Sequence, residues 1–194
     1  MNERIKACLV WLSRIGHCRG FGVQSPSAYR FIRYVINEHY PYYAYEDMRK
    51  AMPDVSWLTR RRMELYFRVV NHLQPSLLYD NGSDDMSLFT KYVTAASSKV
   101  RIMSSDDVPE KMENIDLARI TPSDNLDTVL SAVLQRSHDN MVIMIEGIVE
   151  DSRAREAWRR LVHSDKTSVC YDLYYLGIAF CDTKRLKDCH IVNF

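Results

Sequence analysis

Short apolar segments alternate with helical patterns from residue 76 onward, and this alternation constrains the fold more than any other feature. The clearest segment is Met141–Ile145, a continuous apolar run typical of a strand buried on both faces of a parallel sheet. Helical periodicity lies on either side of it, over 123–134 and 152–162. Strands that alternate with helices predict an α/β protein with a mostly parallel sheet.

The remaining elements of this region follow from the same patterns. Further strands are expected at 76–80, 99–104, 116–120, 168–175, 177–181 and 190–194, and a further helix at 85–96. Ser123 is the expected N-cap of the helix over 123–134. The segments 168–175 and 177–181 are close enough in sequence to form a hairpin.

Residues 1–74 have a different pattern, which predicts helices alone. We therefore expect two domains, an N-terminal helical extension over 1–74 and an α/β domain over 75–194. Ser25 followed by Pro26 is a strong helix start, and a longer helix is expected over 57–73. A first helix carries apolar residues at helical spacing, which predicts an amphipathic helix: Ile5, Cys8, Leu9, Leu12 and Ile15.

Charge and cysteine content limit the classes of function. The net charge is +1, but residues 1–75 carry 12 Lys/Arg against 6 Asp/Glu, whereas residues 76–194 carry 14 against 19. The five cysteines are scattered and form no CxxC pair, which disfavours a metal site or a disulfide framework and favours a reducing cytoplasm. No apolar run is long enough to span a bilayer, so no membrane association is expected.

Two clusters in the helical part allow more than one interpretation. The run Arg60–Arg62 could belong to a nucleic-acid or anion-binding face, but a solvated helix face that pairs with the acidic half is favoured. The tyrosines at 40, 42, 43 and 45 could stack on a base or an adenine, but packing of a helical cap onto a sheet is favoured. His17, in a glycine-containing loop, is the one histidine that we suspect of a functional role.

Several segments together resemble a known family. They are Gly20–Pro26, Tyr42–Tyr45, Leu65–Asn71, Pro75–Ser83, Ala157–Trp158 and Asp172–Phe180. With these segments the chain resembles class I S-adenosylmethionine-dependent methyltransferase-like proteins of the kind found in Bacteroides and related bacteria. The resemblance implies a Rossmann-like sheet whose last strand is inserted antiparallel. It also implies that the cofactor lies across the carboxyl ends of the first strands.

The resemblance also implies which residues hold S-adenosylmethionine. Asp80, Gly82 and Ser83 match the acid-x-Gly-Thr turn after the first strand, and Glu146 matches an acid after a later strand. No metal ligand and no catalytic residue is implied.

Other positions depart from the family pattern. Met86 replaces a glycine, Thr121 replaces an aspartate and Gly147 replaces an acid. The family has an acid at the end of the second strand that binds the ribose of the cofactor. Here Asp106 and Asp107 come two or three residues after that position. Only ten residues, Asp106–Ile115, stand where the family has a helix, a strand and a helix, so the sheet is expected to lack an edge strand.

The sequence therefore predicts a methyltransferase-like protein that uses S-adenosylmethionine and acts on an unknown substrate. The departures from the family pattern support an alternative, a non-catalytic relative that serves as a protein-interaction or assembly module. The expected partners are a small molecule or another protein, with a homodimer as a further expectation and nucleic acid disfavoured.

Overall fold

The computed structural model describes residues 3–82, 84–105 and 114–194, and the chain divides into two compact units. The helical unit contains Met1–Gln74, Asp85–Val100 and Asn193–Phe194. The sheet unit contains Pro75–Asp84 and Arg101–Val192. The domain division that we predicted at residue 74 stays a prediction, because compactness alone does not define a domain.

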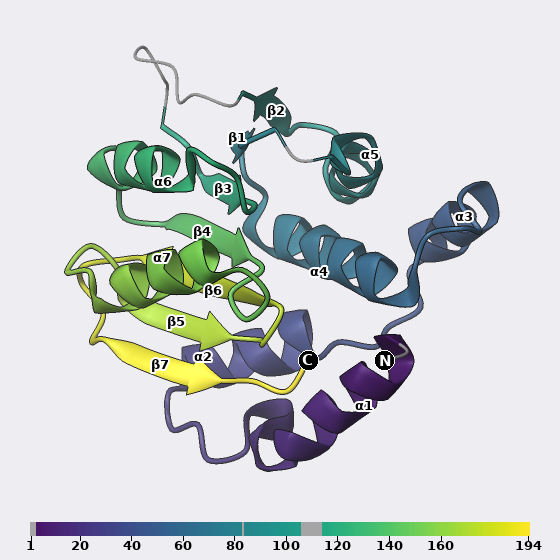
Figure 1. Cartoon of the computed structure of the whole chain (residues 1–194), viewed down its shortest axis with the longest axis horizontal. Helices are drawn as coiled ribbons and strands as arrows, with labels where there is room; N and C mark the ends of the chain where they lie inside the picture. Colours follow the sequence, from purple (N-terminus) through teal and green to yellow (C-terminus); the bar gives the residue numbers. More distant parts are fainter. Residues whose placement is uncertain (1–2, 83, 106–113) are drawn as a thin grey trace. The chain divides into compact units, whose positions relative to one another are not determined.

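The sheet unit is built on one seven-stranded sheet with the order β2-β1-β3-β4-β6-β5-β7 (Figure 1). Its strands are β1 (Leu77–Asp80), β2 (Arg101–Ser104), β3 (Leu117–Ile120), β4 (Met141–Glu146), β5 (Val169–Asp172), β6 (Leu176–Cys181) and β7 (Asp188–Ile191). The strands β2, β1, β3 and β4 are parallel, and β6 runs antiparallel to both of its neighbours. The predicted α/β fold with a mostly parallel sheet is confirmed.

The two edges of the sheet are formed by β2 and β7. Within the described part of the chain, β2 is the outermost strand on its side, and the loss of an edge strand there stays a prediction. The predicted hairpin is the pair β5–β6, in which Cys170 lies opposite Ala179. The last strand was predicted at 190–194, but β7 spans Asp188–Ile191, and it pairs parallel with β5 at the other edge.

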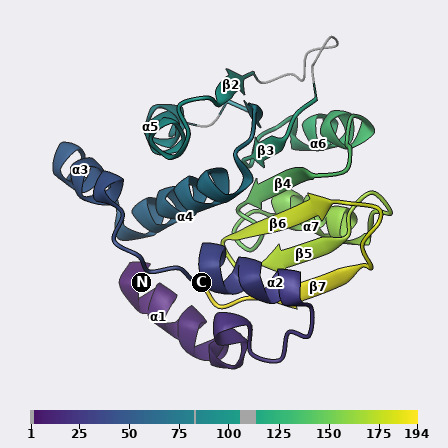
Figure 2. The same ribbon diagram turned by 180° about the vertical axis from the view of Figure 1, so that it is seen from behind.

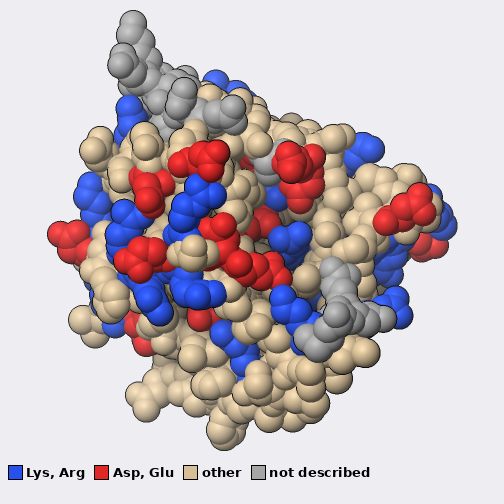
Figure 3. Space-filling view, in the orientation of Figure 1, with Lys and Arg blue, Asp and Glu red and all other residues tan. Residues whose placement is uncertain are grey.

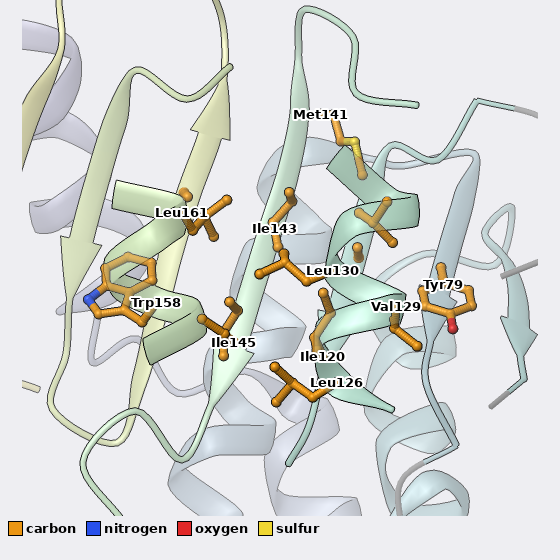
Figure 4. Packing of buried hydrophobic residues seen from close by; sticks show 14 of the residues in the cluster. Tyr79, Ile120, Leu126, Val129, Leu130, Met141, Ile143, Ile145, Trp158 and Leu161 are labelled. Atoms are coloured by element: carbon orange, nitrogen blue, oxygen red, sulfur yellow. The ribbon is translucent and has the colours of Figure 1, made fainter. Parts of the chain in front are cut away.

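Two helices cover one face of this sheet. Helices α6 (Leu126–Gln135) and α7 (Ser152–His163) lie side by side on it (Figures 1 and 2). Their apolar sides meet alternate residues of β4, so that Ile143 and Ile145 are fully buried beneath Leu130 and Trp158 (Figure 4). This cluster is the core of the sheet unit.

The N-cap predicted for α6 is wrong. The helix begins at Leu126, and its N-cap is Asn125 rather than Ser123. The Ser123 hydroxyl instead donates to the Asn125 side chain at 2.9 Å. The predicted range of α7, 152–162, is one residue shorter than the observed helix. Asp151 caps this helix by accepting from the Ala154 amide at 2.9 Å.

The outer surface of α6 and α7 mixes charges of both signs, as Figure 3 shows on the same side as these helices in Figure 1. Three ion pairs account for much of it: Arg153–Asp124, Arg160–Asp127 and Arg159–Glu156. A surface with interspersed charges lacks the single sign that attracts a polyanion.

The helical unit contains seven helical segments in its described part. They are α1 (Glu3–Ser13), η1 (Ile15–Gly20), α2 (Pro26–Phe31), η2 (Ile32–Ile36), α3 (Tyr43–Ala51), α4 (Trp57–Leu73) and α5 (Met86–Ala96). Ser25 caps α2 by accepting from the Ala28 amide at 3.4 Å, as predicted. Helices α4 and α5 pack together, and the rings of Tyr66 and Phe89 meet edge to face at 4.9 Å.

Two features of the helical unit differ from the sequence expectations. Helix α3 was not predicted, because its tyrosine-rich start resembles the end of the preceding helix. Helix α1 forms as predicted, yet Ile5, Leu9 and Leu12 are 52–55% exposed and Val10 is the buried residue. In the described part of the chain, no helix combines the length and apolarity needed to cross a membrane.

Candidate cofactor site at the carboxyl ends of the central strands

The strand order places a candidate site beside β1. The chain goes from β1 to β2 on one side and then to β3 on the other, so the direction of winding reverses at β1. Open α/β sheets bind ligands outside the carboxyl ends of the strands at such a point. The polar residues at these ends are Asp80 and Asn81 after β1, Thr121 after β3 and Glu146 at the end of β4.

Asp80 shapes the turn that follows β1. Its side chain is 0% exposed, and its Oδ1 accepts a hydrogen bond from the Gly82 amide at 2.9 Å. Gly82 has a φ of 81°, a left-handed conformation that favours glycine. The carboxylate therefore acts on its own backbone two residues later, as aspartates commonly do in turns.

The other oxygen of Asp80 binds an arginine that no sequence motif indicated. Arg119 on β3 lies opposite Asp80 in the strand register, and its Nη1 donates to Asp80 Oδ2 at 3.0 Å. Its Nε donates to Glu146 Oε1 at 2.8 Å. The guanidinium is 1% exposed and thus bridges two buried carboxylates.

This Asp80–Arg119–Glu146 triad occupies the face of the sheet opposite the α6–α7 core. Arg119 lies opposite Met144 on β4, and Glu146 follows Met144 by two residues, so their side chains share a face. The core residues Ile143 and Ile145 point the other way. Because removing one partner of a buried ion pair leaves an uncompensated charge, the three side chains depend on one another.

Asn81 joins the end of β1 to the end of β3. Its Nδ2 donates to the Thr121 carbonyl at 3.0 Å and to Ser123 Oγ at 3.1 Å. Its Oδ1 accepts from the Thr121 amide at 2.8 Å and from the Thr121 hydroxyl at 2.9 Å. All four bonds lie within the protein, so Thr121 and Asn81 fix the shape of this edge.

Gly147, at the position where the family has a second acid, meets a steric requirement. Its φ is 71°, and a Cβ there would lie 2.7 Å from Cγ of Pro122. Its amide donates to the Tyr175 carbonyl at 2.8 Å. A larger residue would clash, so the glycine is explained by packing.

The structure thus brings three of the four predicted site residues into one arrangement. Asp80 and Glu146 meet through Arg119, and Gly82 is held by Asp80. Ser83 lies outside the described residues, as do Asp106 and Asp107. One signal could have revealed Arg119: it is a lone arginine inside an apolar strand, between two strands that each end in an acid.

The chemistry of this edge is therefore that of a closed polar network. Arg119 pairs with two carboxylates at once, and Asn81 bonds to the neighbouring backbone. Among the described residues, no group of three His, Cys, Asp or Glu side chains is placed to hold a metal ion. The Gly82 turn, which has no side chain of its own, is where a ligand can come close to backbone.

Comparison with known proteins identifies the fold. No protein-family model and no curated protein sequence matches the chain. Among solved structures, a methyltransferase from Geobacter sulfurreducens aligns over 94% of this chain and 97% of its own, with a TM-score of 0.53 and 12% identity. The chain is also similar to an O-methyltransferase from Bacillus cereus in complex with SAH and to an SAH-bound methyltransferase from Podospora anserina.

The TM-scores of the Bacillus and Podospora structures are lower than that of the Geobacter structure. The Bacillus structure matches with a TM-score of 0.45 and 12% identity over 76% of this chain and 96% of its own. The Podospora structure matches with a TM-score of 0.47 and 9% identity over 85% and 97%. The Geobacter match, at 12% identity, shows the fold alone. The predicted class I methyltransferase-like, Rossmann-like fold is confirmed by it.

Proposed function

We propose that this protein binds S-adenosylmethionine at the carboxyl ends of β1 and β3 and transfers its methyl group to a substrate yet to be identified. The observation that carries the proposal is the Asp80–Gly82 turn at the point where the strand order reverses. The similarity to the Geobacter methyltransferase over nearly the whole chain supports it.

The residues of the turn fit this cofactor. Gly82 has no side chain to block a ligand, and Asp80 fixes its backbone. In this proposal Gly82 and Ser83 contact the cofactor, whereas Asp80 and Glu146 act through Arg119 as positioning residues. When bound, S-adenosylmethionine supplies an electrophilic methyl group. The protein's contribution is then to hold a nucleophile in line and to exclude water.

The experiment is calorimetric titration of the full chain with S-adenosylmethionine and S-adenosylhomocysteine. We expect saturable binding with a Kd on the order of 1–100 μM. Gly82→Asp abolishes it, because the new side chain fills the approach to the turn. Gly22→Asp is the matched control, since Gly22 also has a positive φ of 80° but a Cβ added there would have no atom within 4 Å.

A second function is favoured by Arg119. Its guanidinium engages both acids at the strand ends, where a cationic cofactor would use an acid that is not held by an arginine. The second candidate is a non-catalytic relative whose partner is another protein. Absence of heat up to about 1 mM of either ligand supports this candidate and contradicts the first. A cytoplasmic location remains part of both proposals.

A further inference from the structure

The helical unit contains a groove that plays no part in the proposed cofactor site. Its volume is about 1010 Å³, at the upper end of the range for small-molecule sites. The loop before α3, the helix α3 and the first turns of α4 form it. We call it the tyrosine–arginine groove after six of its lining residues: Tyr40, Tyr42, Tyr45, Trp57, Arg60 and Arg68.

Arg68 is a buried cation that has no carboxylate partner among the described residues. It is 6% exposed. Its Nε donates to the Val35 carbonyl at 2.7 Å, one Nη to the Ile36 carbonyl at 3.0 Å and the other to the Tyr45 hydroxyl at 3.4 Å. A guanidinium has five N–H groups, so these bonds leave donors and an uncompensated charge. A buried charge without a counter-ion is costly.

Arg60, two turns earlier on the same helix, is only half-buried but is also held by backbone carbonyls. Its Nη2 donates to the Met52 carbonyl at 3.0 Å and to the Pro53 and Val55 carbonyls at 3.4 Å. In the described part of the chain, it too pairs with no carboxylate. Residues four apart on a helix are neighbours on one face, and two such steps separate Arg60 from Arg68, so both line the groove.

The acids of the groove do not supply the missing counter-charge. Glu64, between the two arginines, pairs with Arg49 at 2.9 Å. Glu46 pairs with Lys50 at 2.8 Å. Glu38 accepts from the neutral Tyr42 hydroxyl at 2.7 Å and keeps its own charge. The lining residues include four arginines against three glutamates, so the groove keeps an excess of positive charge.

Aromatic rings form the remaining wall. Tyr42 contacts Tyr40 and Tyr45, with ring centroids 5.8 Å and 5.2 Å apart. Tyr40 is 68% exposed and Trp57 is 40% exposed, which leaves ring surface for a ligand. Burial raises the pKa of Tyr45 to about 12, and burial together with the Glu38 hydrogen bond raises the pKa of Tyr42 to about 12. These phenols thus stay neutral and do not repel an anion.

We propose that the tyrosine–arginine groove binds a small molecule that joins a planar aromatic ring to one anionic group, either a carboxylate or a phosphate. The anion meets Arg60 and Arg68, because a guanidinium donates to both kinds of anion in a planar fork. The ring lies against Tyr40, Tyr42 and Trp57, which offer stacking and edge contacts. This proposal does not rest on the binding of S-adenosylmethionine.

A purely structural role for Arg68 explains less of the groove. Val35 and Ile36 end the helical segment η2, and an arginine that caps such carbonyls stabilises a helix end. That role accounts for two of its hydrogen bonds. It does not account for the second arginine without a carboxylate, Arg60, or for the exposed rings beside it.

The experiment is a binding titration of the full chain with four probes, followed by NMR. Two probes carry ring and charge, 4-hydroxybenzoate and phenyl phosphate. Benzyl alcohol carries the ring alone, and inorganic phosphate carries the charge alone. We expect saturation by at least one of the first two below about 10 mM, and at least tenfold weaker binding of benzyl alcohol and of phosphate. The better of the first two probes assigns the anion as carboxylate or phosphate.

Variants locate the site. Arg60→Gln removes one charge and weakens the better probe about tenfold or more. Arg68→Lys keeps the charge but loses the planar fork, and it also weakens binding if it folds. Arg159→Gln, on the charged surface of α7, is the matched control and leaves binding unchanged.

Three results would overturn the proposal. The first is no saturation by either ring-bearing anion. The second is binding of benzyl alcohol or of inorganic phosphate as tight as that of the better probe. The third is an equal Kd for Arg60→Gln and Arg159→Gln. If S-adenosylmethionine fails to bind while these probes succeed, only the proposed cofactor function is lost.

Discussion

Arg119 and Arg68 are both buried arginines, but their hydrogen-bond acceptors differ in charge. Arg119 in the sheet unit donates to two buried carboxylates, those of Asp80 and Glu146. Arg68 in the helical unit donates to two backbone carbonyls and to the Tyr45 hydroxyl. The charge of Arg119 is thus balanced by carboxylates, whereas the charge of Arg68 is met only by the dipoles of neutral groups.

The difference shows what each arginine is able to do for a ligand. A guanidinium already held by two carboxylates has little remaining charge to offer, so Arg119 serves mainly to align strand ends. A guanidinium held by neutral acceptors keeps its full charge, and an anion would complete its surroundings. At the sheet edge the arginine is therefore already engaged by carboxylates, whereas in the groove Arg68 is held by neutral acceptors and can still pair with an anion.

The largest effect is expected from Arg119→Met. The substitution removes the guanidinium that both buried carboxylates contact, which destabilises the protein by about 3–5 kcal/mol. Urea unfolding followed by circular dichroism measures the loss. A loss below about 1 kcal/mol would contradict the mutual dependence of these three side chains.

A combined variant sharpens this result. Asp80→Asn and Glu146→Gln, added to Arg119→Met, remove the two negative charges that Arg119 contacts. We expect this triple variant to recover part of the stability lost by Arg119→Met, because the charges and not the cavity dominate the cost.

A smaller effect is expected from Arg68→Met, which removes three hydrogen bonds but leaves no buried carboxylate behind. The cost is about 2 kcal/mol, from the carbonyls of Val35 and Ile36 that lose their partner. The same urea experiment measures it. A cost equal to that of Arg119→Met would break the comparison, because it would imply a hidden counter-ion near Arg68.

The pH dependence of the groove provides a third test. The pKa values of Tyr42 and Tyr45 are raised from 10.0 to about 12, mainly by burial. Their contribution to stability is therefore complete below pH 10 and is lost as the pH rises through about 12. Near-ultraviolet absorbance of phenolate, compared between the protein and a Tyr42→Phe/Tyr45→Phe variant, follows this titration. Phenolate from these two residues at pH 10 would contradict it.

The smallest effect is expected from Arg159→Met. Its partner Glu156 lies 3.8 Å away, and both side chains are exposed, so solvent screens the pair. The urea midpoint should stay within the scatter of repeated measurements. A clear shift would show that the unfolding experiment responds to surface charge, and the first two comparisons would then need correction for it.

Parts of the sheet unit could be predicted because buried parallel strands leave a strong pattern. The apolar run at Met141–Ile145 predicted β4, and the acids that end β1 and β4 could be placed at one edge of the sheet. The pairing of those acids could not be predicted. It depends on the register that puts Arg119 opposite Asp80, and register is set by packing across the whole sheet.

The helical unit was harder to predict because local sequence preferences were overridden. The run Arg60–Arg62 suggested a solvated face, but Arg60 reaches three carbonyls and Arg61 lies over the Trp57 ring at 5.3 Å. Long arginine side chains can bury their stems while the head group finds distant acceptors. Those acceptors come from a neighbouring loop, which a helical pattern alone cannot reveal.

The helical unit is interrupted in sequence, and this has a consequence for biosynthesis. Its last contributors are Asn193 and Phe194. The Asn193 backbone amide donates to the His17 carbonyl at 3.1 Å, and its side chain donates to the Trp11 carbonyl at 2.9 Å. Phe194 places its ring 4.9 Å from the Arg61 guanidinium. A chain emerging from the ribosome therefore makes its N-terminal helices first, yet those helices acquire these contacts only after the whole sheet has been translated.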